Sequence, residues 1–272
     1  MSEIKFKNKL ISFDRIVAYG CSFTGGGELA DRYLLPNKSA DEVELLKREL
    51  GQDKFNKIPE VAENGGAHWS NVHGKTLAWP AKLSNLFGVP CENMAIGGSS
   101  IQSAVYLIEE DLANGNIKQD DLILVGITGP DRWMYFTNNG EMRRPGSQYV
   151  PMEWPSKGFY NEYITHIAND YNCVYGWYNS IKYIDMLSDR LNGRILQQPC
   201  LAKYSDKNYN SLENHGLINI IKNMSSFKSI IDYDNTLWDM MEDKSDTHAW
   251  YHPKEIYHQR FADHLFEILK YE

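Results

Sequence analysis

The sequence predicts an α/β fold built on a mostly parallel sheet. Short apolar runs that end in glycine alternate with segments of helical periodicity. The run Asp121 to Thr128 (DLILVGIT) is apolar almost throughout, which is typical of a strand covered by helices on both faces. The 272 residues contain no repeat and no clear linker, so we expect a single domain over 1–272.

The expected elements follow in order along the chain. Strands are predicted over 15–19, 91–96, 121–128 and 194–198, and helices over 41–50, 77–87, 101–114, 159–191 (as one or two helices) and 253–271. Asp41 is the expected N-cap of the first helix, and Pro253 is expected in the first turn of the last. Residues 64–70 are expected to form a loop. Two stretches, about 28–75 and 134–193, are interpreted as insertions into this frame.

Composition excludes several classes of function. A formal net charge of -8 argues against sequence-independent nucleic-acid binding and against docking on an anionic membrane. The chain has no apolar run of transmembrane length, and its polar first residues are unlike a signal peptide. Its four cysteines are scattered, which is typical of buried thiols in a reducing compartment. We therefore expect a cytoplasmic protein.

The glycine-rich turn after the first strand carries the clearest chemical signal. Ser22 follows Gly20 at the carboxyl end of the strand Arg15 to Tyr19, where open α/β sheets bind their ligands. Backbone N–H groups of such a turn favour an anion. The turn lacks the Gly-Lys-Ser/Thr of a Walker loop and the spacing of a dinucleotide fingerprint. A nucleophilic serine, a phosphate or flavin-phosphate loop and a purely structural turn remain three interpretations.

Two further glycine- or threonine-bearing strand ends and one histidine-rich segment complete the pattern. The second strand is followed by the glycine pair 97–98, and the third ends at Thr128. A serine hydroxyl needs a neighbouring base to become a nucleophile, and acids and histidines gather between Asp246 and His258. These segments are expected to meet at the carboxyl edge of the sheet.

Taken together, these blocks resemble the SGNH, or GDSL-like, hydrolase family. Residues 20–24 (GCSFT) are similar to its Gly-Asp-Ser-x-Thr block, 93–98 (NMAIGG) to its Asn-x-Gly-x-x-Gly block, 126–128 (GIT) to its Gly-x-Asn block, and 252–253 (HP) to its Asp-x-x-His-Pro block. The resemblance covers both ends and about half of the chain. It implies a flavodoxin-like three-layer α/β/α fold and a serine esterase that needs no cofactor.

The resemblance also implies a role for each matched residue. Ser22 is the expected nucleophile and His252 its base, and an oxyanion hole is expected from Ser22, Gly98 and Thr128. Thr128 replaces the family asparagine, so a hydroxyl stands where an amide donor is usual. The residue three before His252 is Ala249, which cannot act as the acid, and Asp246, six before it, is the expected orienting carboxylate.

Four alternatives stay open at this stage. His248, paired with Asp246, is a second candidate base. Asp246, His248, His252 and His258 are also candidate ligands of a metal ion, although their spacing matches no established motif. Cys21 is a second candidate nucleophile. Adjacent residues point to opposite sides at the end of a strand, so the interpretation with Ser22 at the site makes Cys21 a buried thiol. The fourth alternative is a different class of function: a non-catalytic member of the fold that binds a carbohydrate or nucleotide-like ligand.

The expected substrate is a small-molecule or glycan ester. Arg132, Trp133 and His248 are candidate substrate-binding residues because aromatic and cationic side chains are common in sites for polar ligands. Glycan O-deacetylation is the preferred substrate class, since an acidic, aromatic-rich chain suits a sugar better than a lipid surface.

Overall fold

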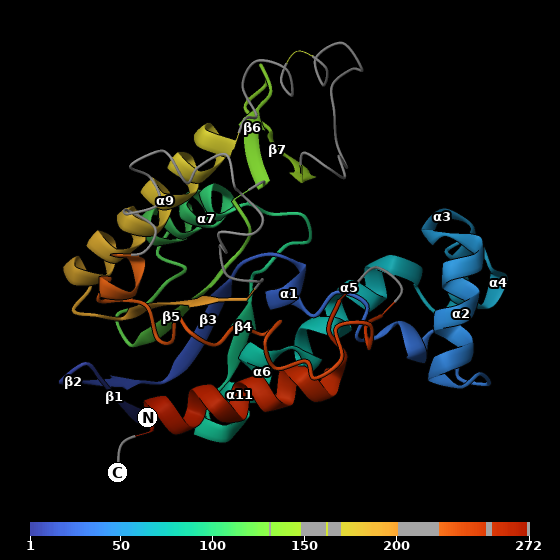
Figure 1. The fold of residues 1–272 in the computed structure, drawn as a ribbon, viewed down its shortest axis with the longest axis horizontal. Helices are drawn as coiled ribbons and strands as arrows, with labels where there is room; N and C mark the ends of the chain where they lie inside the picture. Colours follow the sequence, from blue (N-terminus) through green and yellow to red (C-terminus); the bar gives the residue numbers. More distant parts are fainter. Residues whose placement is uncertain (131, 148–161, 163–169, 201–222, 249–251, 271–272) are drawn as a thin grey trace.

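A computed structural model gives the fold, and it describes residues 1–130, 132–147, 162, 170–200, 223–248 and 252–270. Its centre is a four-stranded parallel sheet in the order β4-β3-β5-β8 (Figure 1). The four strands are β3 (Arg15–Tyr19), β4 (Cys91–Asn93), β5 (Asp121–Ile127) and β8 (Ile195–Pro199). The first strand, β3, pairs with β4 on one side and with β5 on the other. The chain therefore adds β4 on one side of β3 and then β5 and β8 on the other side.

Helices cover both faces of this sheet (Figure 1). Helices α6 (Trp79–Phe87) and α11 (Glu255–Leu269) lie on one face, and α7 (Ile101–Ala113) and α9 (Asp170–Arg190) lie on the other. Alternate residues of β3 therefore enter different cores: Ala18 packs with the first pair of helices and Val17 with the second. This double burial explains why the strands are apolar throughout and confirms the predicted three-layer α/β fold.

The N-terminus forms a hairpin that the sequence did not predict. Strands β1 (Ser2–Phe6) and β2 (Lys9–Phe13) pair in antiparallel register, with Ile4 opposite Ile11. Their turn contains Lys7 and Asn8, both with positive φ. The two-residue turn lacks the glycine that usually marks such a hairpin. Buried Ile4, Ile11 and their neighbours extend the core on the α6/α11 face.

The stretch after β3 is helical almost throughout. It contains α1 (Ser22–Gly25), η1 (Asp31–Tyr33), α2 (Ala40–Leu50), α3 (Gln52–Phe55), α4 (Pro59–Glu63) and α5 (Gly66–Leu77). Helices α2, α3 and α4 extend to one side of the sheet (Figure 1). They bury a small core of their own, which includes Leu34, Val43 and Phe55.

Two local expectations for this stretch were wrong: the loop over 64–70 and the N-cap Asp41. The predicted loop 64–70 lies mostly inside α5, because its small and polar residues continue the helix from Gly66. The N-cap of α2 is Ser39 and not Asp41, since Ser39 and Glu42 satisfy each other's backbone N–H groups in a capping box.

A second hairpin lies at the start of the second predicted insertion, about 134–193. Strands β6 (Arg132–Phe136) and β7 (Met142–Ser147) pair antiparallel and project beyond α7 and α9 (Figure 1). The first part of the predicted helix 159–191, residue 162 apart, lies outside the described residues, and α9 supplies most of the rest. A short η3 helix (Asn223–Ser226) lies between β8 and α11.

The last helix begins later than predicted. Lys254 is the N-cap of α11, so Pro253 precedes the helix. Pro253 instead pairs with Thr247 in an isolated antiparallel bridge, which closes the loop that carries His252. Within the described part of the chain, no helix combines the length and apolar character that crossing a bilayer requires.

Candidate active site

The turn between β3 and α1 presents Ser22 at the carboxyl edge of the sheet. Gly20 has φ +152°, and a side chain there would place its Cβ 2.3 Å from Thr24 Oγ1. Only glycine fits this tight reversal. Ser22 is the first residue of α1 and is partly exposed, whereas the preceding Cys21 is fully buried in the core. The turn therefore exposes the hydroxyl and hides the thiol.

His252 comes from the opposite end of the chain and contacts this hydroxyl. Its Nε2 lies 2.7 Å from Ser22 Oγ, a hydrogen-bond distance. The carbonyl oxygen of His252 accepts a hydrogen bond from the backbone N–H of His248 at 2.9 Å. The ring of Phe23 lies 5.4 Å from the imidazole, centroid to centroid. These contacts fix the imidazole next to Ser22.

The carboxylate that contacts His252 is that of Glu28. Its Oε2 lies 2.7 Å from His252 Nδ1, and its side chain is 6% exposed. Glu28 has φ +67°, a left-handed conformation that a residue with a side chain seldom adopts. Such strain is concentrated at functional sites, where the surrounding structure enforces it. Ser22, His252 and Glu28 thus form an unbroken hydrogen-bonded row.

The structure corrects the expectation for Asp246. Its carboxylate pairs with Lys254 Nζ at 2.5 Å and accepts a hydrogen bond from Tyr257 Oη at 2.6 Å. These contacts attach the loop to the first turn of α11, and the Nδ1 atom of His252 is occupied by Glu28 instead. The physical reason is the loop bridge between Thr247 and Pro253, which aims Asp246 at the helix that follows.

Electrostatics at Glu28 favour its ionised form. Burial alone would raise the pKa of its carboxyl group, but hydrogen bonds and positive charge from His252 and Lys47 outweigh burial and lower the pKa to about 2. Lys47 Nζ lies 2.6 Å from Glu28 Oε1. Glu28 therefore remains an anion at any pH at which a histidine base would work.

The other C-terminal histidines have separate partners. His248 Nδ1 lies 2.5 Å from Glu44 Oε1. His258 Nδ1 accepts a hydrogen bond from the backbone N–H of Trp79 at 3.1 Å, and burial lowers the pKa of His258 to about 3. Within the described residues, no group of three histidine, cysteine or acidic side chains is arranged to hold a metal ion.

The two remaining oxyanion candidates lie after the neighbouring strands. The segment that follows β4 runs beside the Ser22 turn, with Ile96 N–H donating to Gly20 O at 3.0 Å, and Gly98 follows with φ +76°. Thr128 directly follows β5 and is 2% exposed. Its buried hydroxyl has no hydrogen-bond partner among the described residues, while its carbonyl oxygen accepts from Trp177 Nε1 at 2.6 Å. Thr128 thus offers an uncommitted hydroxyl.

The substrate-binding candidates Arg132 and Trp133 are the first residues of β6, which begins five residues after the end of β5. Arg132 is partly buried, and within the part of the chain that the structure describes its buried Nη1 atom has no hydrogen-bond partner. The ring of Trp133 packs against that of Tyr135 at 5.5 Å.

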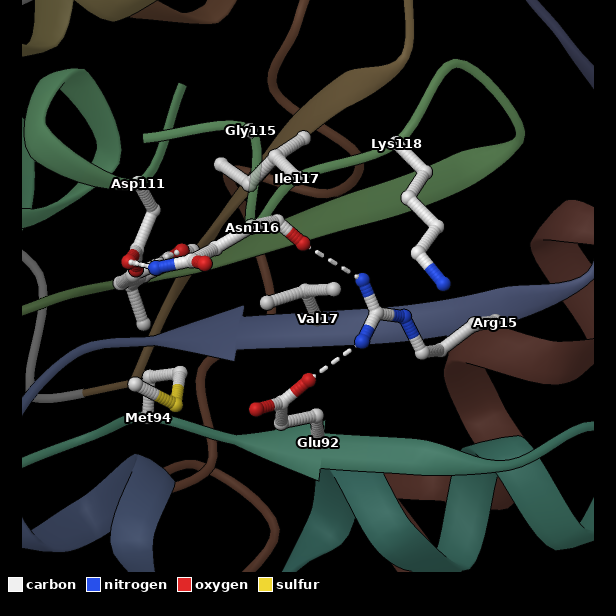
Figure 2. Close-up of a pocket in the computed structure, with 10 residues that line it drawn as sticks. Arg15, Val17, Glu92, Met94, Asp111, Gly115, Asn116, Ile117 and Lys118 are labelled. Atoms are coloured by element: carbon white, nitrogen blue, oxygen red, sulfur yellow. Dashed lines mark hydrogen bonds and ion pairs between the residues drawn. The ribbon is translucent and has the colours of Figure 1, made fainter. Parts of the chain in front are cut away.

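A pocket of about 250 Å³ lies elsewhere on the sheet (Figure 2). It is lined by Arg15, Val17, Tyr19, Glu92, Met94, Asp111, Gly115, Asn116, Ile117 and Lys118. Figure 2 shows the Arg15 guanidinium between Glu92 and the carbonyl oxygen of Asn116. Its polar groups largely satisfy one another, and none of the candidate site residues lines it. The pocket therefore adds nothing to the row at Ser22.

Sequence reasoning missed Glu28 and Lys47. Glu28 lies only six residues after Ser22, at the end of the glycine run 25–27. Lys47 interrupts the apolar face that Val43 begins, which is the one available signal of a buried charge. Neither pattern shows that Glu28 meets His252 or that Lys47 meets Glu28, because both contacts depend on the fold of the segments between them.

Comparison with known proteins shows similarity at the level of the fold. No protein-family model and no curated protein matches this sequence. A solved variant of an acetyl-xylooligosaccharide esterase from Geobacillus stearothermophilus superposes with a TM-score of 0.50 at 11% identity, covering 96% of each chain. An acetyl xylan esterase gives 0.43 at 12% identity, over 93% of this chain and 98% of that one. A structure from Desulfitobacterium hafniense, described as of the G-D-S-L lipolytic family, gives 0.41 at 12%, over 94% and 99%.

The fold and the site together define a class. The sheet and its order are those of an open parallel α/β protein, and Ser22 follows an inner strand at the carboxyl edge, where such folds bind their ligands. The chain has the fold of the SGNH, or GDSL-like, hydrolases in a divergent form, as the sequence motifs predicted.

Proposed function

We propose that this protein is a serine hydrolase that cleaves carboxylic esters. Ser22 is the nucleophile, His252 the general base and Glu28 the carboxylate that orients the base. The observation that carries the proposal is the row Ser22–His252–Glu28, joined by two contacts of 2.7 Å. A serine hydroxyl is a weak nucleophile until a neighbouring base takes its proton, and this row supplies that base and a carboxylate that orients it.

The geometry supports a two-step acyl transfer. With its proton on Nδ1, held by Glu28, the imidazole of His252 accepts the Ser22 proton at Nε2. Ser22 Oγ bonds to the ester carbon, and the departing alkoxide takes the proton from His252 to leave as an alcohol. Water then attacks the acyl-serine, with His252 again taking and returning one proton, and the products are a carboxylic acid and free Ser22.

An oxyanion hole follows from the same turn. Ser22 is the first residue of α1, where backbone N–H groups have no acceptor within the helix. We assign the N–H groups of Ser22 and Gly98 and the hydroxyl of Thr128 as donors to the developing oxyanion. The Thr128 hydroxyl is buried and has no partner among the residues that the structure describes, which supports this role.

The preferred substrate is an acetyl ester of a sugar. The hairpin that begins with Arg132 and Trp133 supplies polar and aromatic surface of the kind that sugars bind. The solved structure with the TM-score of 0.50 carries the name of an acetyl-xylooligosaccharide esterase, which makes acetylated xylo-oligosaccharides the first substrates to test.

Hydrolysis of p-nitrophenyl acetate by the purified chain tests the proposal, followed by acetate release from acetylated xylo-oligosaccharides. We expect activity in the wild type and its loss in Ser22→Ala. Ser12→Ala is the matched control, because that hydroxyl donates to Glu3 on the N-terminal hairpin. A fluorophosphonate should label the wild type and Ser12→Ala but not Ser22→Ala. No turnover and no labelling of the wild type would contradict the proposal, and a sugar that then raises its melting temperature would indicate a binding protein.

A further inference from the structure

A buried ionic cluster lies directly behind the row. Lys47 Nζ contacts Glu28 Oε1 at 2.6 Å and also pairs with Asp31. The Lys47 side chain is 2% exposed, and both carboxylates are 6% exposed. The hydroxyl of Ser70 donates to the other oxygen of Asp31. Glu28 is therefore held from two sides, by His252 on one oxygen and by Lys47 on the other.

The cluster is costly to bury, which indicates a role for it. A buried ammonium group loses its hydration, and an apolar side chain of similar volume often stabilises a fold as well or better. Val43, one turn earlier on α2, and Phe55, whose ring lies 5.9 Å from Lys47 Nζ, make this environment apolar. Packing alone would favour leucine or methionine at position 47.

The signs of the charges decide what the cluster does to His252. Two carboxylates and one ammonium leave one net negative charge beside the imidazole. The ammonium opposes the formation of an imidazolium at His252, and Asp31 favours it. Removing Lys47 therefore favours the imidazolium of His252, and removing Asp31 disfavours it.

We infer that Lys47 and Asp31 are positioning residues: Lys47 holds Glu28 ionised, Asp31 holds Lys47 in place, and together they set the pH at which His252 is a free base. The inference rests on the proposed function for its catalytic consequence. It also assigns a role to helix α2 in the insertion, which carries Lys47, and to η1, which carries Asp31.

Other titratable groups near His252 are distinguishable from this pair. His258, on α11, interacts with the charge of His252 but is buried and uncharged, with its pKa lowered to about 3. His248 is paired with Glu44 of α2. Lys82, on α6, pairs with Glu255 at 2.5 Å and provides a matched control.

The test is a pH titration of four variants. We expect the acid limb of the kcat/KM profile to move up by about one pH unit in Lys47→Met, since the imidazolium is then favoured. It should move down in Asp31→Asn and return close to the wild-type position in the double variant, where the charge is balanced again. Lys82→Met should leave it unchanged.

A readout independent of turnover accompanies the kinetics. The Cε1 resonance of His252, assigned by its absence in His252→Gln, should titrate with the same order of midpoints across the variants. This separates the two proposals: a wild type without esterase activity contradicts the proposed function, and the resonance still tests the cluster. If Lys47→Met does not fold, Asp31→Asn and the double variant still test the inference, because Asp31→Asn alone should lower the midpoint and the double variant should restore it. Midpoints that do not move in opposite directions, in folded variants, would overturn the inference.

Discussion

Two carboxylates compete, in principle, for the role of orienting His252, and the structure separates them by their surroundings. Glu28 is buried, strained at φ +67° and bound to both His252 and Lys47. Asp246 is close to His252 in sequence, but its side chain is 37% exposed and binds Lys254 and Tyr257. Proximity along the chain is thus a poor guide to which carboxylate meets the imidazole.

The contrast has a physical basis. A carboxylate in water interacts weakly with a neighbouring imidazole because the solvent screens the charge. In the buried environment of Glu28 the same interaction is stronger, and His252 together with the ammonium of Lys47 keeps the carboxylate ionised there. Asp246 is suited to fastening a loop to a helix, whereas Glu28 is suited to holding a base.

The largest expected effect separates the two carboxylates by activity. Glu28→Gln removes the anion that fixes the tautomer of His252, so kcat should fall by about 10³–10⁴-fold. Asp246→Asn should change kcat by less than about threefold while lowering the free energy of unfolding by about 1 kcal/mol, because only the contacts with α11 weaken. The measurements are steady-state ester hydrolysis and denaturant unfolding. Equal losses of kcat in the two variants would break the comparison.

The next effect concerns acid stability. The pKa of Glu28 is lowered in the folded protein from 4.5 to about 2. Its ionisation therefore stabilises the fold above pH 4.5, and the stabilisation is lost as the pH falls towards 2. This corresponds to on the order of 3 kcal/mol, at about 1.4 kcal/mol per pH unit.

Urea unfolding at several pH values between 5 and 2 checks this expectation. The wild type should lose more stability over that window than Glu28→Gln, whose side chain does not titrate. The pKa of Asp246 is lowered as well, chiefly by Lys254, but solvent screens that exposed pair. Asp246→Asn should therefore follow the wild-type curve closely. A Glu28→Gln curve parallel to the wild type would contradict the assignment.

The smallest expected effect probes the space around the row. A Cβ at Gly27 would lie 3.0 Å from Ser22 Cβ and 3.1 Å from His252 Nε2. Gly27→Ala should push the two reacting groups apart and lower kcat by about tenfold, since small misplacements of reacting groups are costly. Ser245→Ala, an equally small change beside Asp246, is the control and should leave kcat unaltered. A fully active Gly27→Ala would show that the row has room to adjust.

Much of the sheet was determined locally by the sequence. The run Arg15–Tyr19 forms β3 with the predicted bounds, and Asp121–Ile127 forms β5 within one residue of the prediction. Apolar runs bounded by glycine have few alternatives in water, because a strand covered on both faces must be apolar along its length. The position of Ser22 after β3 follows from the same pattern.

The partners of Ser22 were decided by the tertiary structure. His252 was expected from its motif, but its distance of 2.7 Å from Ser22 depends on the packing of α11 beside α6. Glu28 and Lys47 belong to no motif. The sequence predicted Asp246 as the carboxylate beside His252, whereas the structure places Glu28 there, paired with Lys47. A strand or helix depends on neighbours within a few residues, so its pattern is written in the sequence. A buried charge depends on which counter-ion the whole fold brings to it, and no local pattern records that.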